Sequence, residues 1–270
     1  ATAQRIEQWE VIKMNNLKER LKNGEPILGT MINSFDHIDI VKILQVSGFD
    51  YFVIDNEHGS MDYGKVGAML SYARAIGIAG MVRIPEIKRE VVLKYMELGA
   101  DGLLVPNCDD PEEVKKVIEY SKYAPMGNRG VSLYRPHTGF EKLPSGIEYM
   151  KQCNEQNFII CQMESKKGVE NVDAILDIDG VDAVFVGPND LSQGYGIFGQ
   201  LDNPILGEAI DKVIAAADAH GKYSGIFTAG PAVGMKKWID KGMKVNLWSN
   251  DTTMLKNYAS EGVTTIKGLY

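Results

Sequence analysis

The sequence predicts a single (β/α)₈ barrel spanning residues 1–270. Three observations predict it. The chain has 270 residues, near the roughly 250 of a typical barrel. Eight short apolar, β-rich runs alternate with helical patterns from end to end. Several runs are apolar at nearly every position, as in Gly102-Leu103-Leu104-Val105-Pro106, which is typical of parallel strands covered on both faces. Eight strand–helix units favour a closed barrel over an open doubly wound sheet.

The expected strands follow one another at intervals that leave room for a helix between most of them. They are Ile27–Ile32, Tyr51–Asp55, Gly80–Ile84, Gly102–Pro106, Phe158–Glu164, Ala183–Gly187, Tyr223–Thr228 and Val245–Ser249.

The segments between the strands carry helix signals. Leu17 and Leu21 pair at i,i+4 before Gly24 and predict a short first helix, a plug or a lid for the barrel. Asp110 stands as an N-cap ahead of Pro111 and a capping-box glutamate. A later helix is expected to open at Pro231, to end before Gly242, and to bury Val233, Met235, Trp238 and Ile239.

The connection from Tyr123 to Lys151 is unusually long and rich in glycine, proline and arginine. Loops of this length in compact domains are usually functional or form interfaces. It follows the fourth strand–helix unit, where it could cover the barrel mouth.

Composition narrows the class of protein. With 44% hydrophobic and 24% charged residues the chain is globular in type. No apolar run is long enough for a membrane span, and the first ten residues do not resemble a signal peptide. The formal net charge of −7, with no basic stripe, argues against nucleic-acid binding. The odd set of Cys108, Cys153 and Cys161, with no CxxC pair, predicts free thiols and a cytoplasmic location.

Active sites of this barrel form at the carboxyl ends of the strands, so polar residues there are candidates. After the second strand, Asp55 precedes His58 by three residues. A carboxylate so placed can orient an imidazole for work as a general base. The alternative is a loop histidine bonded to a nearby carbonyl.

Arg83 ends the third strand, which is otherwise apolar. A buried guanidinium is costly unless paired. It can clamp a carboxylate or stabilise an enolate oxygen, or it can form a structural salt bridge inside the barrel.

Glu164 and Asp190 follow the fifth and sixth strands and predict a site for a hard cation such as Mg²⁺ or Mn²⁺. Alternatively, Asp190 is an N-cap and Glu164 pairs with Arg83. Motifs such as GxSxG, the P-loop and HExxH are absent from the sequence. Lys244 begins rather than ends its strand, which favours metal-assisted enolisation over imine chemistry.

Taken together, these motifs resemble the HpcH/HpaI aldolase family of metal-dependent pyruvate aldolases, over residues of about 16–262. The resemblance is carried by the segment from Phe49 to His58, Val82–Pro85, Gly102–Pro106, Arg129-Gly130-Val131, Gln162-Met163-Glu164 and Gly180–Ser192.

The resemblance implies a role for each matching residue. Glu164 and Asp190 would bind Mg²⁺, Mn²⁺ or Co²⁺, His58 would act as the base with Asp55 orienting it, and Arg83 would stabilise the pyruvate enolate. Five further residues complete the implied site. Gly187, Pro188, Asn189 and Gln162 would lie beside the substrate carboxylate, and Glu97 would lie at the aldehyde end.

The expected activity is reversible aldol cleavage of a 4-hydroxy-2-oxo acid to pyruvate and an aldehyde. Met31 and Asn189 depart from the family pattern, which leaves the aldehyde open. Oxaloacetate decarboxylation, citrate-lyase-like cleavage of an acyl-CoA and a non-catalytic 2-oxo-acid-binding barrel remain alternatives. The resemblance also implies a homo-hexamer, a trimer of dimers, with a C-terminal helix over Asp251–Ser260 exchanged between neighbours.

Overall fold

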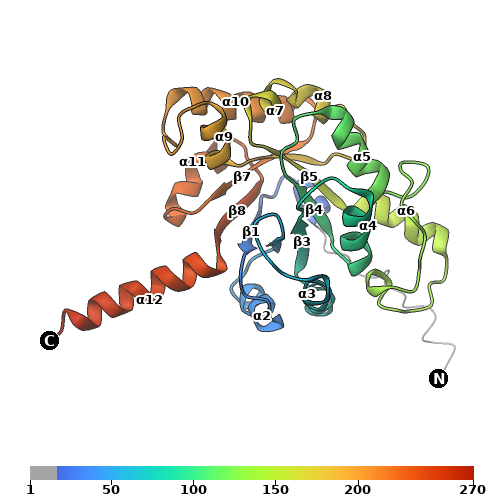
Figure 1. Ribbon diagram of the computed structural model, residues 1–270, viewed down its shortest axis with the longest axis horizontal. Helices are drawn as coiled ribbons and strands as arrows, with labels where there is room; N and C mark the ends of the chain where they lie inside the picture. Colours follow the sequence, from blue (N-terminus) through green and yellow to red (C-terminus); the bar gives the residue numbers. More distant parts are fainter. Residues whose placement is uncertain (1–16) are drawn as a thin grey trace.

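A computed structural model describes residues 17–270 and has the predicted (β/α)₈ fold. Eight parallel strands close into a barrel in the order β1 to β8, with β8 pairing back to β1. Helices surround the barrel, and the last one extends away from it (Figure 1). Within the described part of the chain, no helix is long and apolar enough to cross a membrane. The ten N-terminal residues, which do not resemble a signal peptide, lie outside the described residues.

The predicted strands agree with the observed ones to within one residue at each end. They are β1 (Ile27–Ile32), β2 (Tyr51–Asp55), β3 (Ala79–Arg83), β4 (Gly102–Val105), β5 (Phe158–Met163), β6 (Ala183–Val186), β7 (Tyr223–Thr228) and β8 (Val245–Asn250).

The helices lie between the strands and at both ends of the described chain. They are α1 (Leu17–Lys22), α2 (Ile38–Val46), α3 (Tyr63–Ile76), α4 (Arg89–Leu98), α5 (Pro111–Ser121), α6 (Gly146–Gln156), α7 (Lys166–Glu170), α8 (Val172–Leu176), α9 (Pro188–Gly194), α10 (Pro204–Ala219), α11 (Lys236–Asp240) and α12 (Asp251–Lys267), with 3₁₀ turns η1 (Pro136–Thr138) and η2 (Ala232–Met235).

The short first helix is a plug. Leu17 and Leu21 of α1 are buried with side chains from the barrel interior, including Phe158. Lys18 pairs with Asp182 at 2.6 Å, just before β6 begins. The helix therefore closes the amino ends of the strands and leaves the carboxyl ends for a site.

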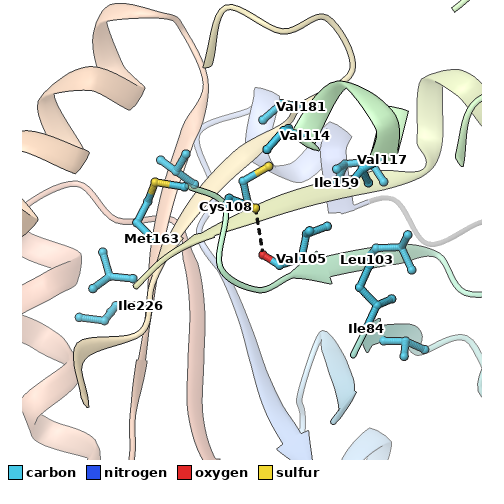
Figure 2. Close-up of a cluster of buried hydrophobic side chains, with 14 of the residues drawn as sticks. Ile84, Leu103, Val105, Cys108, Val114, Val117, Ile159, Met163, Val181 and Ile226 are labelled. Carbon is cyan, nitrogen blue, oxygen red and sulfur yellow. Dashed lines mark hydrogen bonds between the residues drawn. The ribbon is translucent and has the colours of Figure 1, made fainter. Parts of the chain in front are cut away.

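A second core fills the space between the sheet and the helices. Figure 2 shows part of it around Cys108, with Ile159 and Met163 of β5 and Val114 and Val117 of α5 among its side chains. The Cys108 thiol donates a hydrogen bond to the Val105 carbonyl at 3.2 Å. All three cysteines are free and buried.

The helix predicted after Pro231 differs from the prediction in its buried face. Met235 and Trp238 are buried, but Val233 and Ile239 are 79% and 45% exposed, so their predicted burial is wrong. The segment starts as the 3₁₀ turn η2 and continues as α11. Because a 3₁₀ turn has three residues per turn, the helical period assumed from the sequence does not hold across it.

The long connection lies beside the barrel rather than over its mouth. Its η1 turn packs against α3 and α4. Arg74 of α3 donates hydrogen bonds to the carbonyl of His137 and, at 3.2 Å, to that of Gly99. Gly99 precedes β4, so this connection covers the flank of the barrel toward the amino ends of the strands.

Candidate active site

The candidate residues gather where the strands end. Asp55 and Arg83 are the last residues of β2 and β3, and their backbones are paired in register. Glu164 follows β5 directly, and Asp190 lies in the first turn of α9, directly after β6. The closed barrel brings these carboxyl ends to one rim.

Arg83 is held by two carboxylates. Its Nε and Nη2 donate to Asp55 at 2.9 and 2.7 Å, a bidentate pair that is buried. Its Nη1 lies 3.0 Å from Oε2 of Glu57. The salt bridge considered as an alternative for Arg83 is therefore present, and its partners are Asp55 and Glu57 rather than Glu164.

His58 is not oriented by Asp55 in this structure. Oδ1 of Asp55 accepts the backbone N–H of His58 at 3.2 Å, while the carboxylate is committed to Arg83. The imidazole side chain is 69% exposed, and Nε2 lies 4.0 Å from Oε2 of Glu57. The neighbouring carboxylate of the imidazole is therefore Glu57.

Glu164 is buried and held on both oxygens. Oε2 accepts the backbone N–H of Asn107 at 3.0 Å, and Oε1 accepts a hydrogen bond from Nε2 of Gln162. Burial raises the pKa of Glu164 to about 7, with Glu57 and Asp190 adding to the rise. A buried carboxylate with a raised pKa, beside other carboxylates, is in a suitable environment for a bound cation.

Gly187 allows the side chains of Glu164 and Gln162 to pack against its backbone. A Cβ at this position would lie 2.8 Å from both Nε2 of Gln162 and Oε1 of Glu164. Only glycine, which has no Cβ, lets these two side chains lie so close to the backbone at this position. Gly187, Gln162 and Glu164 therefore meet at one point.

The residues present fit a hard divalent cation. Asp55, Glu57 and Glu164 lie near one guanidinium, that of Arg83, and Asp190 lies near Glu57 and Glu164, so negative charge is in excess. Residues 17–270 hold no cluster of three or more His, Cys, Asp or Glu side chains arranged for a metal. Glu164 and Asp190 would therefore supply two carboxylates and leave the other positions to water and substrate, as Mg²⁺ sites commonly do.

Four other residues singled out from the sequence have different surroundings. Glu97 is in α4, and its one ionic contact within residues 17–270 is with Nε of Arg135 at 4.0 Å. Pro188 and Asn189 line a cavity of about 520 Å³ that extends past Phe227 toward Trp238. Met31 is buried among the side chains of the barrel interior.

Glu57 and Asn107 are site residues that the sequence did not single out. Glu57 stands next to His58, but nothing in the sequence indicates that it, rather than Asp55, faces the imidazole. Asn107 has a φ of 51°, in the left-handed region, where asparagine is more common than most residues. Its position just after β4 is the one signal that could have drawn attention to it.

A parallel barrel with carboxylates, an arginine and a histidine at its mouth has the arrangement of an enzyme active site. Residues 31–256 match the family model described as HpcH/HpaI aldolase/citrate lyase. The chain belongs to this family, and the protein is a carbon–carbon lyase.

Individual relatives agree with this assignment. The chain is 35% identical over 185 residues to 5-keto-4-deoxy-D-glucarate aldolase of Enterobacter sp. strain 638. The matched segment covers 68% of this chain and 71% of the relative. An HpcH/HpaI aldolase structure from Desulfitobacterium hafniense DCB-2 is 37% identical, with a TM-score of 0.90 over 93% of this chain and 96% of its own. The structure of the citrate synthase SbnG is 26% identical, with a TM-score of 0.83 over 93% and 97%.

Proposed function

We propose that the protein reversibly cleaves a 4-hydroxy-2-oxo acid to pyruvate and an aldehyde, using a divalent cation held by Glu164 and Asp190. The observation that carries the proposal is the buried Glu164 carboxylate, held by Asn107 and Gln162 against the backbone of Gly187. Similarity to a 5-keto-4-deoxy-D-glucarate aldolase supports the aldol reaction.

The cation would act as a Lewis acid that polarises the 2-oxo group of the substrate. The pyruvyl carboxylate would lie beside the Gly187-Pro188-Asn189 backbone and near Gln162. Arg83 would direct a free N–H toward the oxygen on which negative charge grows as the enolate forms. Its two bonds to Asp55 hold the guanidinium in one orientation, so little reorganisation accompanies the reaction.

His58 would take the proton of the C4 hydroxyl during cleavage and return it during condensation. The exposure of its imidazole supports a position on the solvent side of the site, where the aldehyde would enter and leave. The contact of Glu97 with Arg135, on the flank of the barrel toward the amino ends of the strands, does not support the role at the aldehyde end that the resemblance implied.

The test is to incubate the purified protein with Mn²⁺, pyruvate and a panel of aldehydes, and to follow aldol formation. Exchange of the pyruvate C3 protons into deuterium oxide measures enolisation without any aldehyde. Absence of both reactions with Mn²⁺, Mg²⁺ and Co²⁺ would refute the proposal.

A second candidate is condensation or cleavage of a citrate-like acid, which the similarity to citrate synthase SbnG favours. Oxaloacetate would then replace the aldehyde as the acceptor. Product analysis with pyruvate or acetyl-CoA as donor and oxaloacetate as acceptor distinguishes the two, because only one of them forms a citrate-type product. Oxaloacetate decarboxylation is measured in the same assay as pyruvate release without a donor.

A further inference from the structure

Glu57 lies between two groups of residues in the candidate site: Arg83 with His58, and Asn107 with Glu164. Its Oε2 is 3.0 Å from Nη1 of Arg83 and 4.0 Å from Nε2 of His58. Its Oε1 accepts a hydrogen bond from Nδ2 of Asn107 at 3.3 Å. The side chain is only 15% exposed, so water competes weakly with these contacts and their electrostatic strength is greater than at the surface.

Asn107 connects Glu57 to Glu164 through two hydrogen bonds. Its side chain donates to Glu57, and its backbone N–H donates to Oε2 of Glu164 at 3.0 Å. The left-handed backbone, with φ of 51°, lets one residue present these two donors to two different carboxylates. Such a conformation is uncommon outside glycine and persists where the surrounding structure holds it in place.

The neighbouring residue Cys108 helps to hold the backbone of Asn107 in its left-handed conformation. Its side chain is 1% exposed and packs in the core between β5 and α5, which Figure 2 shows. Its backbone N–H donates to the Gln162 carbonyl at 3.3 Å, and its thiol donates to Val105. Asn107 is therefore fixed to a rigid part of the barrel.

Asp55 and Glu57 contact different nitrogens of the Arg83 guanidinium. Asp55 binds Nε and Nη2 along one edge of the guanidinium, and Nη1 remains for Glu57. Removing the Glu57 charge would leave Nη1 without its carboxylate and the imidazole without its negative neighbour, while the Asp55 pair stayed intact. Glu57 can therefore be tested separately from the structural pair.

We infer that Glu57, held by Asn107, is a positioning residue for the proposed reaction: it fixes the Nη1 end of Arg83 and the place of the His58 imidazole relative to Glu164. The inference rests on the proposed function. Glu57 acts through Arg83 and His58, and it neither binds the cation nor contacts the substrate.

Three variants test this inference. Glu57→Gln keeps the shape of the side chain and removes its charge. Asn107→Gly removes the amide that holds Glu57 but keeps the backbone N–H to Glu164 and tolerates the left-handed φ. The double variant combines them. Glu86→Gln is the matched control, because Glu86 pairs with Lys88 on the exposed surface.

Each variant is measured for pyruvate C3 proton exchange with saturating Mn²⁺, for Mn²⁺ affinity by calorimetry without pyruvate, and for melting temperature. We expect Glu57→Gln to slow exchange about 10- to 100-fold, the usual loss on removing a residue that supports a site. Asn107→Gly should slow it less. The double variant should resemble Glu57→Gln alone, because both changes break one chain of contacts.

We expect Mn²⁺ affinity to stay within about threefold of the wild type, a free-energy change under about 1 kcal/mol, and Glu86→Gln to match the wild type. Exchange at the wild-type rate in Glu57→Gln would overturn the inference. So would a loss of Mn²⁺ affinity that accounts for the slower exchange, since Glu57 would then be a ligand, or additive effects in the double variant. If the wild type itself exchanges no protons with any of the three metals, the proposed function fails first.

Discussion

Two parallel hydrogen bonds join Arg83 to Asp55, Nε to Oδ1 at 2.9 Å and Nη2 to Oδ2 at 2.7 Å. Both side chains are nearly inaccessible to water, with exposures of 9% and 2%. The same carboxylate also accepts the backbone N–H groups of Glu57 and His58. Asp55 thus fixes Arg83 and the start of the loop that carries His58. It connects the guanidinium and the imidazole without a direct hydrogen bond to the imidazole.

The Arg83–Asp55 pair predicts that Arg83→Ala and Arg83→Lys differ in stability. Removing one partner of a buried ion pair typically costs about 3–5 kcal/mol, so Arg83→Ala should lower the free energy of unfolding by that amount. Arg83→Lys keeps the charge but not the planar fork and should lose less. Urea unfolding measures both.

The same pair of variants tests the role of Arg83 in enolisation. If an N–H of the fixed fork stabilises the enolate, folded Arg83→Lys should exchange pyruvate C3 protons about 10²- to 10³-fold more slowly. Wild-type exchange in folded Arg83→Lys would show that the arginine serves the fold alone.

The difference between prediction and structure at Asp55 has a physical cause. Strand ends are visible in the sequence because apolar runs end there, and this placed Asp55, Arg83, Glu164 and Asp190 at one rim. Which carboxylate pairs with which positively charged side chain depends on strand register. The register of β2 and β3 places Asp55 directly beside Arg83. Sequence spacing alone suggested His58 as the partner, because the chain between them is short. Asn107 was missed for a related reason: its role comes from a backbone conformation rather than from residue type.

The cation prediction concerns Glu164 and Asp190. Glu164→Gln and Asp190→Asn should each weaken Mn²⁺ binding strongly. The loss should exceed the roughly 10- to 100-fold that follows removal of a residue that hydrogen-bonds to a metal ligand. Chelation with EDTA should abolish pyruvate proton exchange, and Mg²⁺, Mn²⁺ or Co²⁺ should restore it. Calorimetry on the chelated protein gives the affinities. Full activity after exhaustive chelation would contradict the metal assignment, and inactivation by borohydride with pyruvate would indicate a lysine imine instead.

His58→Ala tests the base. Loss of a general base typically lowers the rate about 10²- to 10⁴-fold, and we expect a fall of that size in the kcat of aldol cleavage. The Mn²⁺ affinity should change little, because the imidazole is exposed and contacts Glu57 rather than Glu164. A parallel loss of metal and activity would instead identify His58 as a ligand.

The stability of the fold should depend on pH through Lys122. Its Nζ is buried and donates to the carbonyls of Asn154 and Asn157 at 2.9 and 2.7 Å. Burial, with the charge of Lys18, lowers the pKa of Lys122 to about 7 in the folded protein. The unfolded chain keeps a lysine pKa of about 10.4. Between these values the unfolded state binds more protons, so stability rises with pH, by up to about 1.4 kcal/mol per unit.

Comparison with Lys122→Met isolates this effect. Methionine does not titrate, so the slope of stability with pH between pH 7 and 10 should be smaller in the variant than in the wild type. Other titrating groups cancel in the difference between the two proteins. Identical slopes in urea unfolding across this range would show that Lys122 does not titrate there.

The last prediction concerns α12 and the assembly. This helix leaves the barrel (Figure 1), and its one buried residue is Asp251, whose carboxylate accepts the backbone N–H groups of Asn33, Ser34 and Phe35 at 2.8–3.1 Å. Its direction is therefore fixed at its start. Leu255, Tyr258 and Ile266 are 57%, 81% and 57% exposed, and their spacing of three and eleven residues places them on one side of the helix.

An isolated helix of this length is marginal in water, because most helical stability in proteins comes from packing. We therefore expect the apolar side of α12 to pack on a second copy of the chain, within a hexamer built from dimers. Light scattering at micromolar concentration should then give a mass near six times the 29.8 kDa of one chain. Tyr258→Glu with Ile266→Glu places two charges on the apolar side and should lower that mass, whereas Ser260→Glu, on the opposite side, should not. A monomeric wild type would overturn the prediction, and equal effects of the two sets of variants would show that α12 does not form the interface through this side.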